Sequence, residues 1–218
     1  RVNDRRGNLR RNGYRRRRLQ LAQEVDVVEL QPIAIERASQ PANVGYVAVG
    51  GPTLVPFGWV DFCQRYKGEC EATTAPALDV NATPAAIKRI KQINSWVNAN
   101  VKPLSDKDHW GVVDRWDYPT DGYGDCEDYV LLKRRLLIDE GFPRQGLLVT
   151  VVRDEKGDGH AVLTVKTNKG EYVLDNLDDE VRAWNQTRYR FVKRQSQTDQ
   201  NAWVELGDPT SAPLIVSR

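Results

Sequence analysis

Cys126, His160 and Asp175 follow one another in the chain as a nucleophile, a base and an orienting group would. Cys126 begins a predicted helix, whose dipole and unpaired N–H groups would stabilise a thiolate and a tetrahedral oxyanion. His160 begins a predicted strand and Asp175 ends the next one, so antiparallel pairing can bring the two side chains together. The spacing leaves two interpretations open: a Cys–His–Asp hydrolase, or a structural cysteine with an ordinary strand histidine and a turn aspartate.

Acidic residues surround the candidate nucleophile, since Asp125, Glu127 and Asp128 lie within two residues of Cys126. Nearby negative charge raises the pKa of a thiol and disfavours the thiolate. A bound Ca²⁺ would neutralise that charge, because it prefers carboxylate oxygens. Residue types alone favour a simpler account, in which Asp125 caps the helix and the other two acids complement its dipole.

The other cysteines, Cys63 and Cys70, form a close pair in the segment FCQRYKGEC. A close pair and one separate cysteine suggest a local disulfide and a free thiol, as in an oxidising compartment. The alternative is three reduced and unrelated cysteines. A zinc site is disfavoured, because the three Cys and two His include no CxxC or HxxxH pair.

Helical signals precede strand signals along the chain. Thr83 and Pro84 mark the start of a helix that should reach about Asn100, and a shorter helix is predicted from Phe57 to near Gly68. The helix that begins at Cys126 is densely apolar and should end at Gly141. Period-two patterns then predict strands at 146–153, 160–167, 171–174, 188–194 and 202–206. This order predicts an α+β domain in which the central Cys126 helix packs on an antiparallel β-sheet.

The chain has 218 residues, 40% hydrophobic and 28% charged, which suits one domain with an appended arm. Residues 1–55 are rich in Arg, Gln, Asn and Gly and are predicted to be a flexible arm, with a short strand or helix near 19–30. Residues 56–218 would form the domain. The arginines at 15–18 could bind nucleic acid or anionic lipid, or form a solvated tail. No aromatic RNA-binding motif accompanies them, so no nucleic-acid partner is expected.

The hydropathy of the chain and its first residue indicate whether it spans a membrane and whether a signal peptide is present. No run of 18 apolar residues occurs, so the chain is not expected to span a membrane. No intact signal peptide follows the arginines, and the sequence starts at Arg1 without any Met. We therefore expect a processed or truncated form, from which a signal segment could have been removed.

Three motifs in order resemble one protein family: GDCEDY at 124–129, GHAVLTV at 159–165 and YVLDN at 172–176. Together they resemble the bacterial transglutaminase-like cysteine proteinases, of which the LapG-type periplasmic proteases are one branch. The resemblance covers about 56–206 and implies a papain-like, transglutaminase-type core. It implies that Cys126 is the nucleophile, His160 the general base and then acid, and Asp175 the group that holds the imidazole.

The LapG-type branch implies further properties. Its members depend on Ca²⁺ through acids beside the nucleophile, which correspond here to Asp125 and Glu127. They cleave large bacterial surface adhesins and are restrained by an inner-membrane receptor that senses cyclic di-GMP. The resemblance therefore implies a periplasmic or secreted enzyme with a protein substrate, and Ca²⁺ as its one expected cofactor.

Three functions follow from these residues. The first is a cysteine endopeptidase that forms a thioester acyl-enzyme at Cys126. The second is a transglutaminase or amidase acting on Gln or Asn side chains, which would use the same triad. The third is a catalytically idle, Ca²⁺-dependent binding module, which the intact Cys, His and Asp disfavour.

Overall fold

The structure is a computed structural model that describes residues 44–71 and 74–207. Most of the predicted arm, including the element expected near 19–30, lies outside the described residues. Residues 44–55 were also assigned to the arm, yet they include strand β1 (Val49–Thr53). This strand pairs with β9 (Trp203–Leu206) in the main sheet, so these residues belong with the folded domain. The prediction of an arm for residues 1–43 stays a prediction.

Seven strands of the described residues form one sheet in the order β1-β9-β8-β4-β5-β6-β7. Every neighbouring pair in it is antiparallel. Besides β1 and β9, the strands are β4 (Leu147–Arg153), β5 (Gly159–Thr167), β6 (Gly170–Leu174), β7 (Arg182–Ala183) and β8 (Arg190–Gln195). A separate parallel pair joins β2 (Lys102–Pro103) to β3 (Tyr123–Gly124). Strand β3 ends two residues before Cys126.

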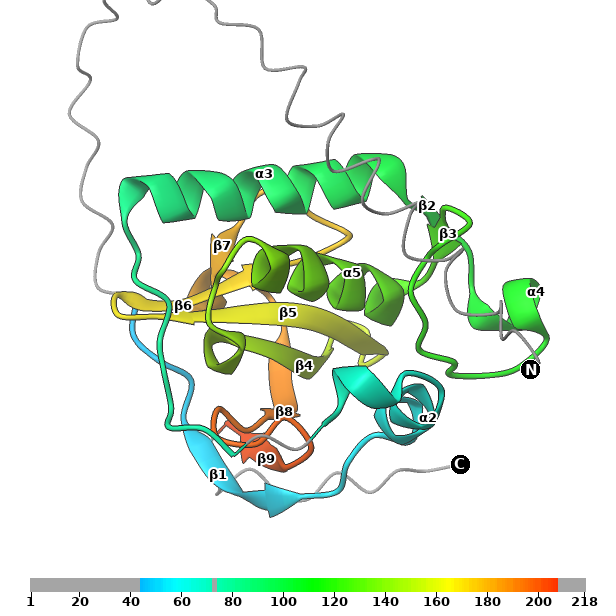
Figure 1. The fold of residues 1–218 in the computed structure, drawn as a ribbon, viewed down its shortest axis with the longest axis horizontal. Helices are drawn as coiled ribbons and strands as arrows, with labels where there is room; N and C mark the ends of the chain where they lie inside the picture. Colours follow the sequence, from blue (N-terminus) through cyan, green and yellow to red (C-terminus); the bar gives the residue numbers. More distant parts are fainter. Residues whose placement is uncertain (1–43, 72–73, 208–218) are drawn as a thin grey trace, which may run out of the picture. The chain divides into compact units, whose positions relative to one another are not determined.

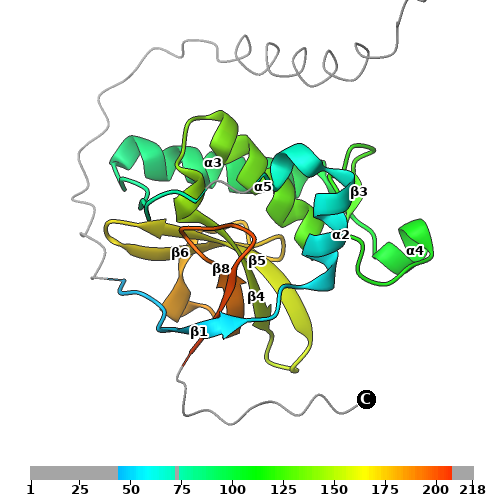
Figure 2. The same ribbon diagram turned by 60° about the horizontal axis from the view of Figure 1, so that its bottom comes forward.

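The helices lie on one face of this sheet (Figures 1 and 2). They are α2 (Phe57–Arg65), α3 (Pro84–Asn100), α4 (Asp106–Trp110) and α5 (Cys126–Asp139), with short 3₁₀ turns at η1 (Lys67–Glu69), η2 (Arg144–Gly146) and η3 (Trp184–Gln186). Helix α5 packs on β4 and β5, and α3 packs on α5. None of the helices in the described residues is long and apolar enough to cross a membrane.

Local signals in the sequence explain how the two main helices start and stop. The Thr83 hydroxyl accepts a hydrogen bond from the N–H of Ala86 at 3.1 Å, which caps α3 as predicted. Helix α5 ends just before Gly141, whose φ of 89° is a left-handed conformation that glycine adopts without strain. Both helices bury an apolar face that joins the sheet in one core, including Ile90 and Val97 of α3 and Leu131 and Leu137 of α5.

The predicted α+β class is confirmed, with the Cys126 helix packed on an antiparallel sheet. Strands β4, β5, β6, β8 and β9 lie within two residues of their predicted bounds. Strand β1 escaped prediction because its sequence, VGGPT, is poor in strand formers. Such a sequence is tolerated at the edge of a sheet, where one side of the strand needs no partner.

Candidate active site

Cys126 is the first residue of α5, and the turn before it is held by its acidic neighbours. Asp125 is the N-cap, and its backbone N–H donates to Asp128 Oδ2 at 3.3 Å as half of a capping box. Gly124 approaches Asp128 so closely that a Cβ would lie 2.6 Å from that carboxylate. A side chain at position 124 would therefore displace the turn that presents the thiol at the helix start.

His160 and Asp175 are brought together by the β5–β6 hairpin. Leu163 pairs with Leu174, so the start of β5 and the residue after β6 lie at the same edge of the sheet. His160 Nε2 lies 2.9 Å from Asp175 Oδ1, and both side chains are almost completely buried. Because Nε2 is held by the carboxylate, the imidazole has Nδ1 left for a second proton partner.

The Asp175 carboxylate has three hydrogen-bond donors. Its Oδ1 also accepts the N–H of Leu177 at 3.1 Å, and its Oδ2 accepts the hydroxyl of Tyr189. Burial acts to raise the pKa of Asp175, but the hydrogen bonds from His160 and Tyr189 and the charge of His160 outweigh it and hold that pKa below its usual value. Asp175 therefore stays ionised and can fix the imidazole.

The Cys126 thiol is half-buried and donates a hydrogen bond to Glu127 Oε2 at 2.7 Å. Burial raises the pKa of the thiol well above its usual value, and the charge and hydrogen bond of Glu127 raise it further. The backbone N–H of Ala161, the residue after His160, acts in the opposite direction. The conflict expected from the acidic neighbours is therefore real, and in this state the thiol keeps its proton.

Four carboxylates crowd around the start of α5. Ligand atoms of Asp125, Cys126 and Glu127 lie within 4.8 Å of one another, and so do those of Asp106, Asp125 and Asp128. Burial and the neighbouring charge of Asp125 raise the pKa of Glu127 to about 9 and that of Asp128 to about 8. Among the described residues, the buried Oδ1 atom of Asp125 has no hydrogen-bond partner. An unpartnered carboxylate oxygen among hard oxygen ligands fits a calcium ion.

Asp106 joins this cluster from α4, nineteen residues before Asp125. Its backbone N–H donates to Asp125 Oδ2 at 3.3 Å, and its own carboxylate accepts the N–H of Arg115. Sequence reasoning missed Asp106, because only the folded chain brings it beside Asp125. The sole local signal was Ser105, which caps α4 and orients Asp106 in the first turn.

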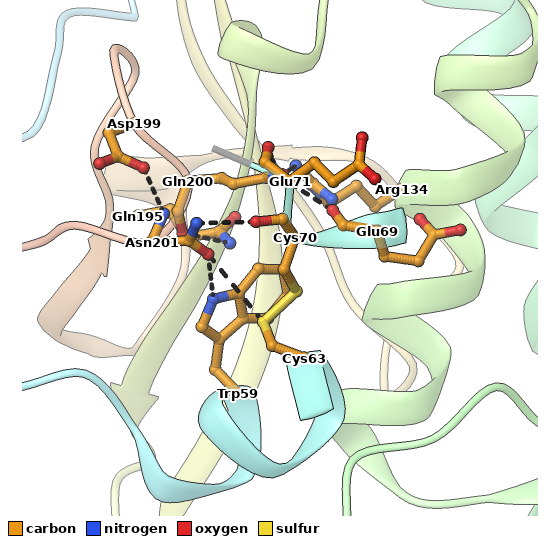
Figure 3. Close-up of a disulfide and its surroundings, with 10 residues drawn as sticks. All are labelled: Trp59, Cys63, Glu69, Cys70, Glu71, Arg134, Gln195, Asp199, Gln200 and Asn201. Carbon is orange, nitrogen blue, oxygen red and sulfur yellow. Dashed lines mark hydrogen bonds between the residues drawn. A yellow bond between two sulfur atoms is a disulfide. The ribbon is translucent and has the colours of Figure 1, made fainter. Parts of the chain in front are cut away.

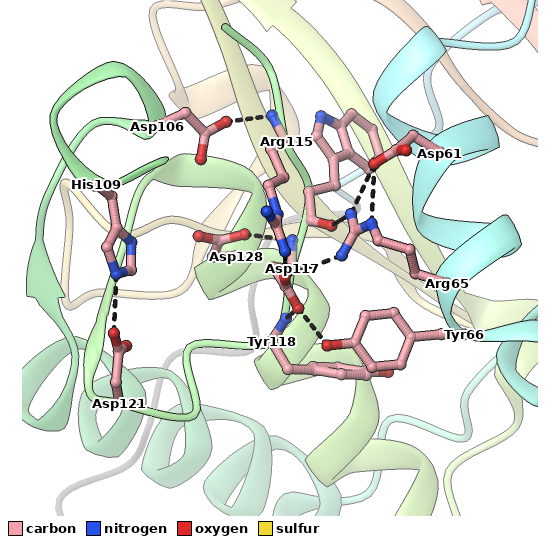
Figure 4. Close-up of polar contacts among 11 residues, drawn as sticks. Asp61, Arg65, Tyr66, Asp106, His109, Arg115, Asp117, Tyr118, Asp121 and Asp128 are labelled. Carbon is pink, nitrogen blue, oxygen red and sulfur yellow. Dashed lines mark hydrogen bonds and ion pairs between the residues drawn. The ribbon is translucent and has the colours of Figure 1, made fainter. Parts of the chain in front are cut away.

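A polar network ties the first turn of α5 to α2 (Figure 4). Asp128 Oδ1 accepts the N–H of Asp117 at 2.7 Å. The Asp117 carboxylate in turn accepts from Arg65 at 2.9 Å, from Arg115 at 3.2 Å and from the hydroxyl of Tyr66. Asp128 thus has a structural task besides its place in the acidic cluster, and it fixes the loop before Cys126.

Cys63 of α2 and Cys70, the residue after η1, are joined by a disulfide (Figure 3). Cys126 is the free cysteine. Asn201, in the loop before β9, bridges this region. It accepts from Trp59 Nε1 at 3.2 Å and donates to the carbonyl of Cys70 at 2.9 Å. The disulfide therefore anchors the end of α2, where Arg65 and the next residue, Tyr66, join the network around Asp117.

Comparisons with known proteins identify the family. A family model described as bacterial transglutaminase-like cysteine proteinase matches residues 49–211. The calcium-bound LapG of Legionella pneumophila is 21% identical with a TM-score of 0.48, over 61% of this chain and 77% of that one. Its EGTA-treated form is 22% identical with a TM-score of 0.48, over 60% and 75%. A search of curated proteins found no match.

Proposed function

Because the chain belongs to the bacterial transglutaminase-like cysteine proteinase family, and so is a cysteine peptidase, we propose that it cleaves a protein substrate with Cys126 as nucleophile. His160 would be the general base and Asp175 the group that orients it. The observation that carries this proposal is the buried His160–Asp175 pair at 2.9 Å, which leaves Nδ1 of the imidazole to receive the thiol proton.

The proposed reaction has two steps. His160 takes the proton of Cys126 as the sulfur attacks the scissile carbonyl, and N–H groups at the start of α5 stabilise the oxyanion. The imidazolium then gives its proton to the leaving amine, and a thioester remains on Cys126. In the second step His160 activates a water molecule that hydrolyses the thioester and frees the enzyme. Asp175 stays ionised throughout and stabilises the imidazolium.

Asp125 and Glu127 are the residues that we propose hold Ca²⁺, with Asp106 and Asp128 beside them. The support is the crowding of these carboxylates, the raised pKa values of Glu127 and Asp128, and the unpartnered Oδ1 of Asp125. A bound divalent cation offsets the negative charge that opposes ionisation of the thiol. The capping contacts of Asp125 and Asp128 use other oxygen lone pairs, so capping and metal binding are compatible.

The substrate that we propose is a large bacterial surface adhesin, cleaved in the periplasm or outside the cell under control of a cyclic di-GMP receptor. Motif resemblance to the LapG-type branch supports this choice, and the Cys63–Cys70 disulfide fits an oxidising compartment. A transglutaminase or amidase would use the same three residues, so the acceptor must be identified by experiment.

The test is cleavage of a recombinant adhesin N-terminal fragment, followed on gels and by mass spectrometry. We expect the wild type to cut it, whereas Cys126→Ala and Asp175→Asn should lose at least about 10³-fold in rate while keeping their fold. Asp158→Asn, on the exposed β4–β5 turn, is the matched carboxylate control and should cleave normally. Cleavage by Cys126→Ala would refute the nucleophile, and incorporation of a fluorescent primary amine without cleavage would favour the transferase.

A further inference from the structure

Lys133 is a completely buried cation. It lies on α5 about two turns after Cys126, and its exposed fraction is 0%. Its Nζ has no hydrogen-bond partner among the described residues, although it lies 5.9 Å from the ring centroid of Tyr129. A buried ammonium is strongly unfavourable unless opposite charges compensate it. We therefore expect opposite charges nearby that compensate Lys133.

The compensating charges come from the turn that follows β6. Asp175 and Asp179 are the carboxylates whose negative charge favours the protonated form of Lys133. The turn itself is fastened to α3: Asn98 Nδ2 donates to the carbonyl of Asp175 at 2.9 Å and to Asp179 Oδ1 at 2.8 Å. Asn94 Nδ2 donates to the carbonyl of Asp179 at 3.0 Å. The Asp175 turn is thus held by α3 and faces a buried cation from α5.

The same layer contains buried acceptors that are also unpartnered. Oδ1 atoms of Asn94, Asn98 and Asn176 have no hydrogen-bond partner among the described residues. An ammonium offers three N–H donors, and amide oxygens are strong acceptors. The place of Lys133 in the fold therefore suits a group that ties α5 to the turn carrying Asp175.

We propose that Lys133 is a positioning residue for the reaction: it holds the Asp175 turn and, through the charge of Asp175, sets how tightly His160 binds its proton. The inference rests on the proposed Cys126–His160–Asp175 triad. An ammonium beside Asp175 reduces the negative potential that stabilises the imidazolium. With Lys133 charged, His160 therefore gives up its proton more readily than it would beside an uncompensated carboxylate.

The groups around Asp175 and Lys133 determine how the titrations of Lys133 and His160 are expected to be coupled. Asp175 is faced by His160 from β5, by the Tyr189 hydroxyl from the segment before β8, and by Lys133 from α5. Burial raises the pKa of Tyr189, so this hydroxyl stays a neutral donor at working pH. Burial lowers the pKa of Lys133 to about 7, against the pull of Asp175 and Asp179. Lys133 then titrates in the range where a histidine ordinarily does, and the two protons should interact.

The decisive measurement is an NMR titration of His160 in the full chain carrying Cys126→Ala. The chain contains two histidines, so His109 is an internal reference. Lys133→Met keeps the apolar stem and removes the charge, and we expect the pKa of His160 to rise by about one unit while that of His109 stays constant. Lys91→Met removes the same charge from the exposed face of α3 and should leave His160 unchanged.

If the Lys133→Met variant folds and the pKa of His160 is the same as without this substitution, the proposal is overturned. If that variant does not fold, Lys133→Gln provides the same comparison, and the wild type gives another. In the wild type, the Lys133 and His160 titration curves should each show the other's inflection, and two independent curves would overturn the proposal as well. In active protein, kcat should fall more than KM changes. The NMR measurement does not require activity. If Lys133→Met shifts the pKa of His160 but the wild type cleaves no substrate, the result contradicts the proposed function and leaves this inference standing.

Discussion

The Cys126 thiol donates its hydrogen bond to Glu127, with 2.7 Å between Sγ and Oε2, while the imidazole of His160 is held through Nε2 by Asp175. The nucleophile and its proposed base thus have separate carboxylate partners. Glu127 stabilises the protonated thiol, whereas Asp175 stabilises the protonated imidazole. Formation of a thiolate–imidazolium pair requires the influence of Glu127 on the thiol to weaken.

Glu127→Gln should make Cys126 more reactive in metal-free protein. The substitution removes the negative charge that, after burial, contributes most to the raised pKa of the thiol. Above the pKa of about 9 of Glu127, where this carboxylate is ionised in the wild type, a fall of about one unit in the thiol pKa would speed alkylation by iodoacetamide about tenfold, so the rates are compared at pH 10. Cys126 is the free cysteine, so the modified site is unambiguous. Glu180→Gln, at an exposed position, should leave the rate unchanged, and an unaltered rate in Glu127→Gln would contradict the role given to Glu127.

Calcium affinity should rise with pH. The pKa values of Glu127 and Asp128 are raised to about 9 and about 8, and Ca²⁺ binds the ionised carboxylates. Binding near pH 7 must therefore release protons, and fewer as the pH approaches 9. Titration calorimetry in two buffers of different ionisation enthalpy measures this release. Asp125→Asn should weaken binding at every pH, and an affinity independent of pH between 7 and 9 would be inconsistent with these carboxylates as ligands.

The places of Cys126, His160 and Asp175 in the fold were predictable from sequence, because each lies at the end of an element that has a local signal. Cys126 follows an N-cap aspartate, His160 is the second residue of β5, and Asp175 directly follows β6. Each local pattern fixes one element, and antiparallel pairing then brings the two strand residues together. Thr83 and Pro84 fixed the start of α3 in the same way.

Other parts of the site could not be read from the sequence, because they depend on contacts between distant segments. Arg65 reaches Asp117 across 52 positions, and Asp106 meets Asp125 through a loop with no regular pattern. Lys133 interrupts an apolar helical run, and nothing in its local sequence marks it as buried. Its burial follows from the packing of α5 between α3 and the sheet, which no local pattern encodes.

The Cys63–Cys70 disulfide should stabilise the domain through a short loop. Chain-entropy arguments give about 2 kcal/mol for closing a loop of this size. Reduction should therefore lower the melting temperature of the wild type. A double variant, Cys63→Ser with Cys70→Ser, should start lower and show no response to the reductant. Equal melting temperatures of the oxidised wild type and the double variant would show that the disulfide is not needed to hold α2 in place.

Lys133→Met should stabilise the fold even though it perturbs the site. The Lys133 ammonium has no hydrogen-bond partner among the described residues, so replacing it with an apolar side chain of similar length removes the desolvation cost of the buried charge. The pKa of Lys133 is lowered by burial to about 7 in the folded state, against 10.5 as its ordinary value. Between these values the unfolded chain binds the extra proton, so the wild type gains stability as the pH rises from about 7 towards 10.5. Below about 7 Lys133 is protonated in both the folded and the unfolded state, and the full cost of burying its charge is present.

Urea unfolding at pH 6 and pH 9 should therefore show a larger gain in the free energy of unfolding for Lys133→Met at pH 6. A loss of stability at both pH values would mean that the ammonium stabilises the Asp175 turn by more than its burial costs.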